Sequence, residues 1–316
     1  MKAGIIGAGA VGSATAFSLI MTGVAHNVVL VDINTKKAQA EAMDIAHAAP
    51  FNASAGKITA GNYADLRGCE VVIITAGANQ KEGETRIDLL ERNVHIFADV
   101  VPQIVKYAPD CILLITTNPA DIMTEVALKL SNFPRQRVIG SGTVLDTARF
   151  RTLLANYLEV STKSVHADVL GEHGDSEVLV WSSAEAGTLS LEEYATTIGK
   201  NLDDDTKMQI DADVVKAAYK IIEGKGVTCY GIAGALTHIC RAINNNDYSI
   251  LTVSSHHDTV EGVENICLSL PTVINRSGVH HVIMPKLSAD EHKKLRHSAN
   301  TMREFTTQAL SVLEEI

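Results

Sequence analysis

The sequence predicts a doubly wound parallel α/β sheet followed by a C-terminal α+β lobe, and three observations indicate this fold class. Short runs rich in valine and isoleucine recur through the first half of the 316-residue chain. Amphipathic stretches with helical periodicity lie between these runs. The second half departs from that alternation, because it has strand-like runs followed by one long helical pattern.

The apolar runs of the first half are about as long as strands and do not alternate in polarity. This pattern is typical of strands that a parallel sheet buries on both faces. Helical segments such as 13–22 and 93–107 separate them, so strands and helices alternate along the chain. The expected strands are 3–6, 28–31, 71–74, 112–115 and 138–139.

The second half is expected to begin near residue 140. Residues 191–222 have the pattern of one or two helices with an acidic turn at 203–205, while 250–253 and 267–273 are strand-like. Ser288 and Glu291 form a capping-box pattern that opens the last helix. We therefore divide the chain into 1–140 and 141–316, and we expect tight packing because no linker rich in glycine and serine separates the two parts.

Charge and apolar content narrow the class of protein. The formal net charge of −10 argues against binding to nucleic acids or anionic membranes, which favours basic proteins. No apolar run reaches the roughly 18–20 residues that a membrane-spanning helix needs, and the first residues do not resemble a signal peptide. The five cysteines form no C-x-x-C pair. We expect a cytoplasmic protein with reduced cysteines.

Adjacent histidines raise the question of a metal site. Neither His256-His257 nor His280-His281 has the i,i+4 spacing of a helical zinc site, and no cluster of cysteines or carboxylates flanks either pair in the sequence. We therefore expect these histidines to be solvated and the chain to hold no metal. Cys229 has no base beside it in the sequence and is expected to be a packing residue.

The segment Gly7–Gly12 reads G-x-G-x-x-G directly after the first predicted strand and at the start of a helix. The second predicted strand ends at Asp32, twenty residues beyond Gly12, and this completes the context of a dinucleotide-binding Rossmann unit. In such a unit Gly7 permits the tight turn, Gly9 lets the backbone approach a pyrophosphate, and Gly12 lets helix and strand pack closely.

Asp32 predicts the choice of cofactor. Its carboxylate would accept hydrogen bonds from the adenosine ribose and repel a 2′-phosphate, so NAD is favoured over NADP. Lys36 and Lys37 follow closely in the sequence and weaken this preference. The alternative is a glycine turn with a structural aspartate and no ligand, and the flanking strand and helix disfavour it.

Candidate catalytic residues lie in segments that follow predicted strands. His173 is framed by glycines just after an apolar run, where a histidine is exposed and able to act as an acid or base. Asp146 and Arg149 are three residues apart and share one face of a predicted helix. The polar segments 75–86 and 116–119 follow strands at the edge where doubly wound sheets bind ligands.

Six motifs, in order, resemble the lactate/malate dehydrogenase family, and more closely its bacterial L-lactate dehydrogenases. The resemblance extends from Gly7 to the last helix. It implies an NAD-dependent oxidoreductase of glycolysis and fermentation that reduces pyruvate to L-lactate. The motifs are GAGAVG, AGANQKEGETR, TTNPAD, GSGTVLDTARFR, GEHGDSE and GKGVT.

The resemblance implies a role for each candidate catalytic residue. His173 is the proton donor when a 2-keto acid is reduced, and Asp146 binds its other ring nitrogen. Arg149 binds the substrate carboxylate through a bidentate fork. Arg86 polarises the carbonyl from a loop, 78–88, that closes over the substrate. A non-catalytic NAD-binding relative is disfavoured because all four of these residues are present.

The resemblance also implies which residues bind substrate and cofactor. Asn118 and Thr228 complete the substrate pocket, and Gln80 occupies the position where malate enzymes carry an arginine. A neutral glutamine favours pyruvate, while malate dehydrogenase and a broader L-2-hydroxy acid dehydrogenase remain the alternatives. The implied NAD contacts are Gly7, Gly9, Val11, Gly12, Asp32, Lys37, Tyr63, Gly77, Ala78, Thr116, Asn118 and Ser141.

Arg151 and His166 are expected to point away from the substrate. Arg151 lies two residues after Arg149 on the helix, and His166 is in the strand-like segment before His173. They are either surface residues, one in an ion pair, or, as the resemblance implies, an allosteric site for fructose 1,6-bisphosphate across a subunit interface. The resemblance further implies a homotetramer, or a dimer in equilibrium with one.

Overall fold

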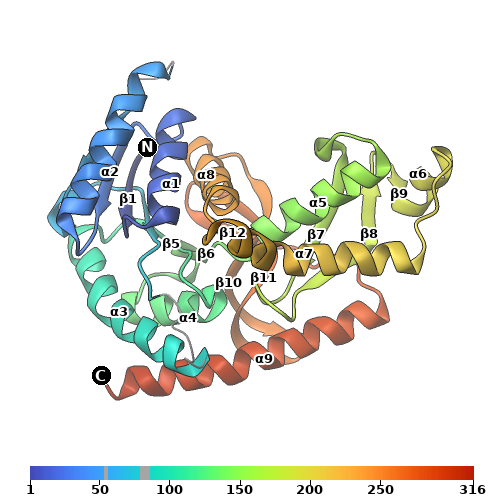
Figure 1. The fold of residues 1–316 in the computed structure, drawn as a ribbon. Helices are drawn as coiled ribbons and strands as arrows, with labels where there is room; N and C mark the ends of the chain where they lie inside the picture. Colours follow the sequence, from blue (N-terminus) through green and yellow to red (C-terminus); the bar gives the residue numbers. More distant parts are fainter. Residues whose placement is uncertain (53–55, 79–85) are drawn as a thin grey trace.

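The computed structural model describes residues 1–52, 56–78 and 86–316 (Figure 1). Its first half alternates strands and helices, and this confirms the predicted fold class. The parallel strands are β1 (Lys2–Ile6), β2 (Asn27–Val31), β3 (Lys57–Ala60), β4 (Val71–Ile74), β5 (Ile112–Ile115) and β6 (Val138–Gly140). The helices between them are α1 (Ala10–Met21), α2 (Thr35–Ala48), α3 (Arg86–Tyr107) and α4 (Ala120–Ser131), with short 3₁₀ helices at η1 (Ala49–Phe51), η2 (Tyr63–Leu66) and η3 (Arg135–Arg137).

The second half adds a small antiparallel sheet and further helices. Its strands are β7 (Val165–Leu170), β8 (Val178–Ala186), β9 (Leu189–Ser190), β10 (Ser249–Val260), β11 (Val263–Asn275) and β12 (Gly278–Val282). Its helices are α5 (Val144–Leu158), η4 (Thr162–Ser164), α6 (Leu191–Thr197), α7 (Asp204–Lys225), α8 (Tyr230–Asn245) and α9 (Ala289–Glu314). Within the described ranges, β7, β8 and β9 form the small sheet.

The main sheet is covered on both faces, and this explains the unbroken apolar runs. Alternate residues of β4 enter different cores. Val72 and Ile74 join the core under α3, α4 and α9, whereas Val71 and Ile73 join the core under α1 and α8. Every residue of β4 is therefore buried, and none needs to be polar.

The main sheet crosses the expected domain boundary. Its strand order in the described residues is β12-β11-β10-β6-β5-β4-β1-β2-β3. β10 runs antiparallel to β6, with Ser254 opposite Gly140, so the second half extends the sheet of the first. The sequence did not predict this pairing, because the two strands are separated by more than a hundred residues. The division at residue 140 therefore stays a prediction.

Helix caps place the ends of the predicted C-terminal helices. The acidic turn separates α6 from α7, and the Asp203 side chain accepts a hydrogen bond from the Thr206 amide at the start of α7. The predicted capping box of Ser288 and Glu291 opens α9. Figure 1 shows α9 in red along one side of the molecule, where it contacts α3 and α4. No helix among the described residues has both the length and the apolar character needed to cross a bilayer.

Candidate active site

The glycine-rich turn after β1 leaves open space beside the first turn of α1. Gly7 has φ of +109°, a conformation that favours glycine. A Cβ atom on Gly12 would lie 1.9 Å from the Gly7 carbonyl oxygen, so only glycine lets the helix approach the strand this closely. A Cβ atom on Gly9 would meet no described atom within 4 Å. The turn therefore fits a pyrophosphate beside Gly9.

Asp32 lies against the same turn at the end of β2. Its Oδ2 atom accepts a 2.6 Å hydrogen bond from the Ala8 amide, and its Oδ1 atom accepts one of 2.7 Å from the Asn34 amide. Two backbone donors thus fix the carboxylate beside the expected phosphate position. Lys37 lies in the first turn of α2, where its amide donates to the Asn34 side chain, and Tyr63 begins η2.

The loops after β4 and β5 are joined by Asn93, a buried residue of α3 that sequence reasoning missed. Its side-chain oxygen accepts a 2.8 Å hydrogen bond from the Ala78 amide, and its side-chain nitrogen donates to the Asn118 carbonyl, also at 2.8 Å. The Thr116 hydroxyl is buried and has no partner among the described residues. This unpaired hydroxyl is suited to a polar ligand at the same edge of the sheet.

The Asp146 carboxylate contacts two other expected catalytic side chains, those of His173 and Arg149. Asp146 is buried, at 2% exposure, in the first turn of α5. Its Oδ2 atom lies 2.6 Å from His173 Nδ1, and its Oδ1 atom accepts a 2.8 Å hydrogen bond from Arg149. The His173 side chain is 25% exposed, so its other ring nitrogen remains available to a substrate.

The electrostatics of this group favour a charged histidine. The negative charge of Asp146 outweighs the effect of burial and raises the pKa of His173 to about 9. Burial alone would raise the pKa of Asp146, but the charge and hydrogen bond of His173, together with Arg149, hold it below its ordinary value. His173 is therefore an imidazolium near neutral pH, ready to donate a proton.

Comparison with known proteins identifies one protein family along nearly the whole chain. The family model for the NAD-binding domain of lactate/malate dehydrogenases matches residues 1–140, and the model for their alpha/beta C-terminal domain matches residues 143–312. The chain belongs to the lactate/malate dehydrogenase family.

Relatives within the family are similar over nearly their full length. The L-lactate dehydrogenase of Thermus aquaticus is 53% identical over 96% of this chain and 97% of its own. That of Allorhizobium ampelinum is 52% identical over 99% of both chains. Among solved structures, a lactate dehydrogenase from a Medee basin deep-sea metagenome library superimposes with a TM-score of 0.94 at 40% identity, covering 98% of each chain.

In this dehydrogenase the segment that carries His173 is held by residues far away in the sequence. Asp121 of α4 accepts a 2.8 Å hydrogen bond from the His173 amide, and Ser298 of α9 accepts one of the same length from the Glu172 amide. Gly171 has φ of +88° and pairs with Ser269 of β11. Sequence reasoning missed Asp121, although it stands in the quoted motif TTNPAD.

Glu177 is a second carboxyl group that the sequence did not single out. One of its oxygens, one of Asp146 and a ring nitrogen of His173 all lie within 4.8 Å of one another. Its Oε1 atom is buried and has no partner among the described residues. Burial and the charge of Asp146 raise the pKa of Glu177 to about 8, so it is largely neutral at pH 7.

Other candidate residues are placed less completely. Ser141 follows β6, and its amide donates to the Ile115 carbonyl, while Thr228 lies just before α8. Gln80 lies outside the described residues, as does most of the loop 78–88. Arg86 is the first residue of α3, and only its backbone is described.

The expectation of solvated histidines is wrong for His256 and His257. The side chain of His256 is only 7% exposed and pairs with Glu125, and His257 is also buried in β10. The sequence could not show this, because Glu125 is 131 positions away. His281, by contrast, is exposed.

Proposed function

We infer that the chain is an NAD-dependent L-lactate dehydrogenase that interconverts pyruvate and L-lactate. The observation that carries this conclusion is the group formed by His173, Asp146 and Arg149 in a chain of this family. It combines a protonated acid, the carboxylate that orients it and a guanidinium for a substrate carboxylate. The chain's similarity to the L-lactate dehydrogenases of Thermus aquaticus and Allorhizobium ampelinum agrees with it.

The glycine turn and the loops after the parallel strands fit NAD. We propose that Gly7, Gly9 and Gly12 contact the pyrophosphate side, and that Val11, Asp32, Lys37 and Tyr63 surround the adenosine half. Gly77, Ala78, Thr116, Asn118 and Ser141 are proposed to contact the nicotinamide half. The bound nicotinamide supplies the hydride in one direction and accepts it in the other.

The chain's own residues position the substrate and move the proton. Because Nδ1 of His173 is hydrogen-bonded to Asp146, Nε2 is the atom that gives its proton to the keto oxygen as the carbonyl is reduced. This transfer leaves a neutral imidazole. In the reverse direction the same nitrogen takes the proton of the lactate hydroxyl. Arg149 binds the substrate carboxylate with the N–H groups that Asp146 does not use. Arg86 stabilises the charge that develops on the carbonyl oxygen.

Steady-state oxidation of NADH with separate keto acids tests this function directly. Pyruvate is expected to be the best substrate, with oxaloacetate poor and larger 2-keto acids intermediate. Faster turnover of oxaloacetate would favour malate dehydrogenase. Similar rates with several unbranched keto acids would favour a broader L-2-hydroxy acid dehydrogenase.

The pH dependence should follow His173. In the free enzyme, kcat/KM for pyruvate reduction is expected to fall as pH rises above about 9, because the imidazolium loses its proton there. For lactate oxidation kcat/KM should rise over the same range, since the neutral ring is the acceptor. Asp146→Asn should move both transitions toward the ordinary histidine pKa of about 6.5.

The control for this pH profile is Asp290→Asn. Asp290 is an exposed carboxylate on α9 that pairs with Lys294 at 2.9 Å. Its removal should leave both transitions in place. Unchanged transitions in Asp146→Asn would mean that another group sets the protonation of the site.

We also propose a homotetramer that fructose 1,6-bisphosphate activates through Arg151 and His166. Arg151 donates to Asp168 at 2.9 Å and to the Ala167 carbonyl at 2.7 Å, and its remaining N–H groups are free to bind a phosphate. Arg151, Lys163 and Asp168 line a cavity of about 500 Å³, where two cations outnumber one carboxylate. His166 is exposed on β7, two positions before Asp168, and the register with β8 shifts between these two residues.

Fructose 1,6-bisphosphate at millimolar concentration is expected to lower the apparent KM for pyruvate several-fold. The ligand must bind the active assembly more tightly than the inactive one to have this effect. Arg151→Gln should abolish the response without changing kcat at saturating pyruvate. If wild-type kinetics do not respond, the two residues have a structural role only.

We also propose that the chain divides into two domains and that the protein is located in the cytoplasm. The limits of the two family matches support units at 1–140 and 141–316. All five cysteines are free and buried, which agrees with a reducing compartment such as the cytoplasm.

A further inference from the structure

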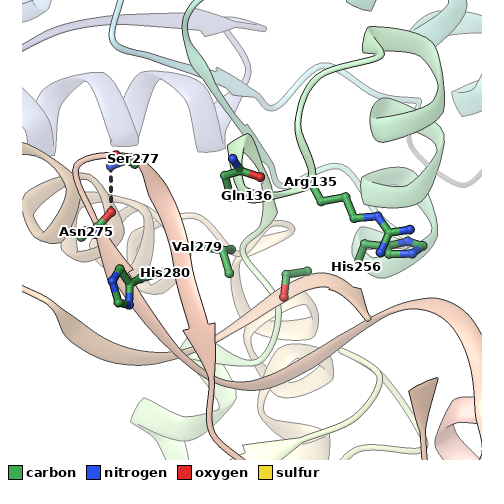
Figure 2. A pocket seen from close by; sticks show the side chains of 8 residues that line it. Arg135, Gln136, His256, Asn275, Ser277, Val279 and His280 are labelled. Atoms are coloured by element: carbon green, nitrogen blue, oxygen red, sulfur yellow. Dashed lines mark hydrogen bonds between the residues drawn. The ribbon is translucent and has the colours of Figure 1, made fainter. Parts of the chain in front are cut away.

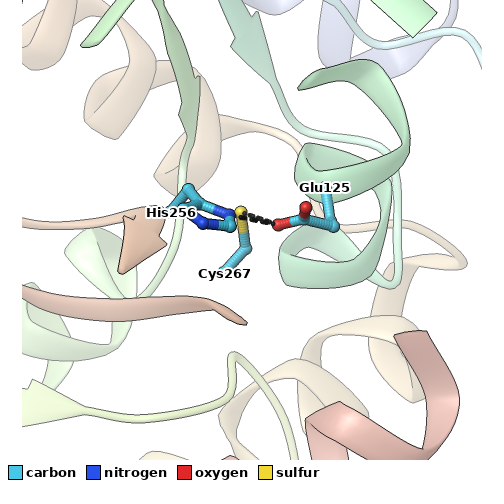
Figure 3. A group of neighbouring side chains, drawn as sticks. All are labelled: Glu125, His256 and Cys267. Atoms are coloured by element: carbon cyan, nitrogen blue, oxygen red, sulfur yellow. Dashed lines mark hydrogen bonds and ion pairs between the residues drawn. The ribbon is translucent and has the colours of Figure 1, made fainter. Parts of the chain in front are cut away.

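Three side chains from separate elements meet outside the active site. Glu125 comes from α4, His256 from β10 and Cys267 from β11 (Figure 3). The Glu125 Oε2 atom lies 2.9 Å from His256 Nδ1 and 3.0 Å from Cys267 Sγ. One donor atom from each residue lies within 4.8 Å of the other two. The cluster therefore presents a nitrogen, a sulfur and an oxygen to one point.

The cluster is almost closed to solvent. The side chains of His256 and Glu125 are 7% and 13% exposed, and Cys267 is 1% exposed. His256 Nε2 is buried and has no hydrogen-bond partner among the described residues. The nitrogen that faces Glu125 is Nδ1, so Nδ1 is the candidate ligand atom of the cluster and Nε2 lies on the opposite side of the ring.

We propose that Glu125, His256 and Cys267 form a binding site for a divalent transition metal of the Zn²⁺ class. Zinc takes thiolate, imidazole and carboxylate ligands at about 2.0–2.3 Å with tetrahedral geometry, which separates the donor atoms by roughly 3.3–3.7 Å. The two separations from Glu125 Oε2, 2.9 Å to His256 Nδ1 and 3.0 Å to Cys267 Sγ, need to widen by only a few tenths of an ångström, and the nitrogen and the sulfur lie within 4.8 Å of each other. A fourth position remains for water or another small ligand.

Charge balance favours the metal. Binding breaks the S–H bond of Cys267, forms an S–Zn bond and releases the proton to solvent. The thiolate and the Glu125 carboxylate together then neutralise Zn²⁺. Without a metal, the thiol of Cys267 donates to Glu125 at 3.0 Å.

Glu125 is already suited to be the anionic ligand. Its Oε2 atom lies at hydrogen-bond distance from both His256 Nδ1 and Cys267 Sγ. The nearest cation, Arg135, is paired with Asp258, so its charge is offset. His256 and Arg135 also line a cavity of about 420 Å³ (Figure 2), so this cavity adjoins one member of the cluster.

The site would join elements that support the catalytic loop. Glu125 lies one turn after Asp121 on α4, and Asp121 accepts the hydrogen bond from the His173 amide. Cys267 lies two residues before Ser269, whose backbone pairs with Gly171. A bound metal would therefore fix α4 to β10 and β11 and raise the unfolding temperature of the native assembly.

Titration of the full-length enzyme with Co²⁺, under a non-thiol reductant, tests the site. We expect one Co²⁺ per chain, a near-ultraviolet thiolate-to-cobalt charge-transfer band, and displacement of Co²⁺ by Zn²⁺. Cys267→Ser should remove the band, and Glu125→Gln should weaken binding at least about tenfold. The other group of possible metal ligands among the described residues is Asp146, His173 and Glu177. It contains no cysteine, so metal binding there could not produce this band.

The matched control is Cys240→Ser, since Cys240 is equally buried but lies in α8 outside any metal-ligating group found among the described residues. This variant should keep the band and the metal-dependent rise in unfolding temperature. Absence of the band in folded wild-type enzyme, or its persistence in Cys267→Ser, would overturn the proposal. If Cys267→Ser does not fold, unchanged Co²⁺ affinity in both Glu125→Gln and His256→Asn would overturn it equally.

Discussion

His173→Ala is expected to lower kcat for pyruvate reduction at least about 100-fold, a typical effect of removing a general acid. The imidazolium is the group whose proton reaches the keto oxygen. Its side chain is partly exposed, and the Asp146 carboxylate 2.6 Å from its ring keeps it charged. In the variant the proton would have to come from water or from the neutral carboxyl group of Glu177. Stopped-flow single-turnover rates with NADH and pyruvate measure the change at the chemical step.

Two further measurements separate this chemical effect from a loss of structure. NADH affinity, followed by fluorescence, should remain nearly unchanged in His173→Ala because the cofactor contacts lie on other loops. His281→Ala removes an exposed histidine on β12 and should keep wild-type kcat. A near-normal kcat in His173→Ala would exclude this residue as the proton donor.

The parallel half of the fold could be predicted because its signals are local. Each residue of β4 and β5 is apolar, since helices cover both faces of the sheet, and the runs therefore stand out in the sequence. β10 and β11 were predicted too short. β10 continues through Ser254, Ser255 and two histidines, whose polarity hides a strand that is mostly buried.

The catalytic residues could be predicted because each lies in a motif, but their supporting contacts could not. Asn93 is a single amide on a helix, and only the folded chain shows that it joins the loops after β4 and β5. The contact of Asp121 with the His173 amide spans 52 positions. The cluster around His256 was missed for the same reason, because its carboxylate and thiol come from other elements.

These supporting contacts share a physical feature. Asn93, Asp121 and Glu125 are polar residues of helices that pack against the sheet, and buried polar groups are costly unless they are hydrogen-bonded. Asn93 and Asp121 are almost fully buried, and each satisfies a backbone amide of a catalytic or cofactor loop. A polar residue in a buried helix face is thus a sequence signal for such loop supports, although it does not identify the partner.

Substrate choice is expected to depend on Gln80, which the family resemblance places at the specificity position six residues before Arg86. A dicarboxylate bound there would bury its distal carboxylate beside a neutral amide, and an unpaired buried charge costs several kcal/mol. We therefore expect kcat/KM for pyruvate to exceed that for oxaloacetate at least about 100-fold. Rates of NADH oxidation with each keto acid measure the ratio.

Gln80→Arg should narrow this ratio at least about tenfold or reverse it, because the guanidinium pairs with the distal carboxylate through a bidentate hydrogen bond. Gln80→Glu is the matched control, since it changes the same side chain but adds the opposite charge. It should reject oxaloacetate even more strongly than the wild type does. A wild-type preference for oxaloacetate, or equal ratios in the two variants, would show that another residue sets the choice of substrate.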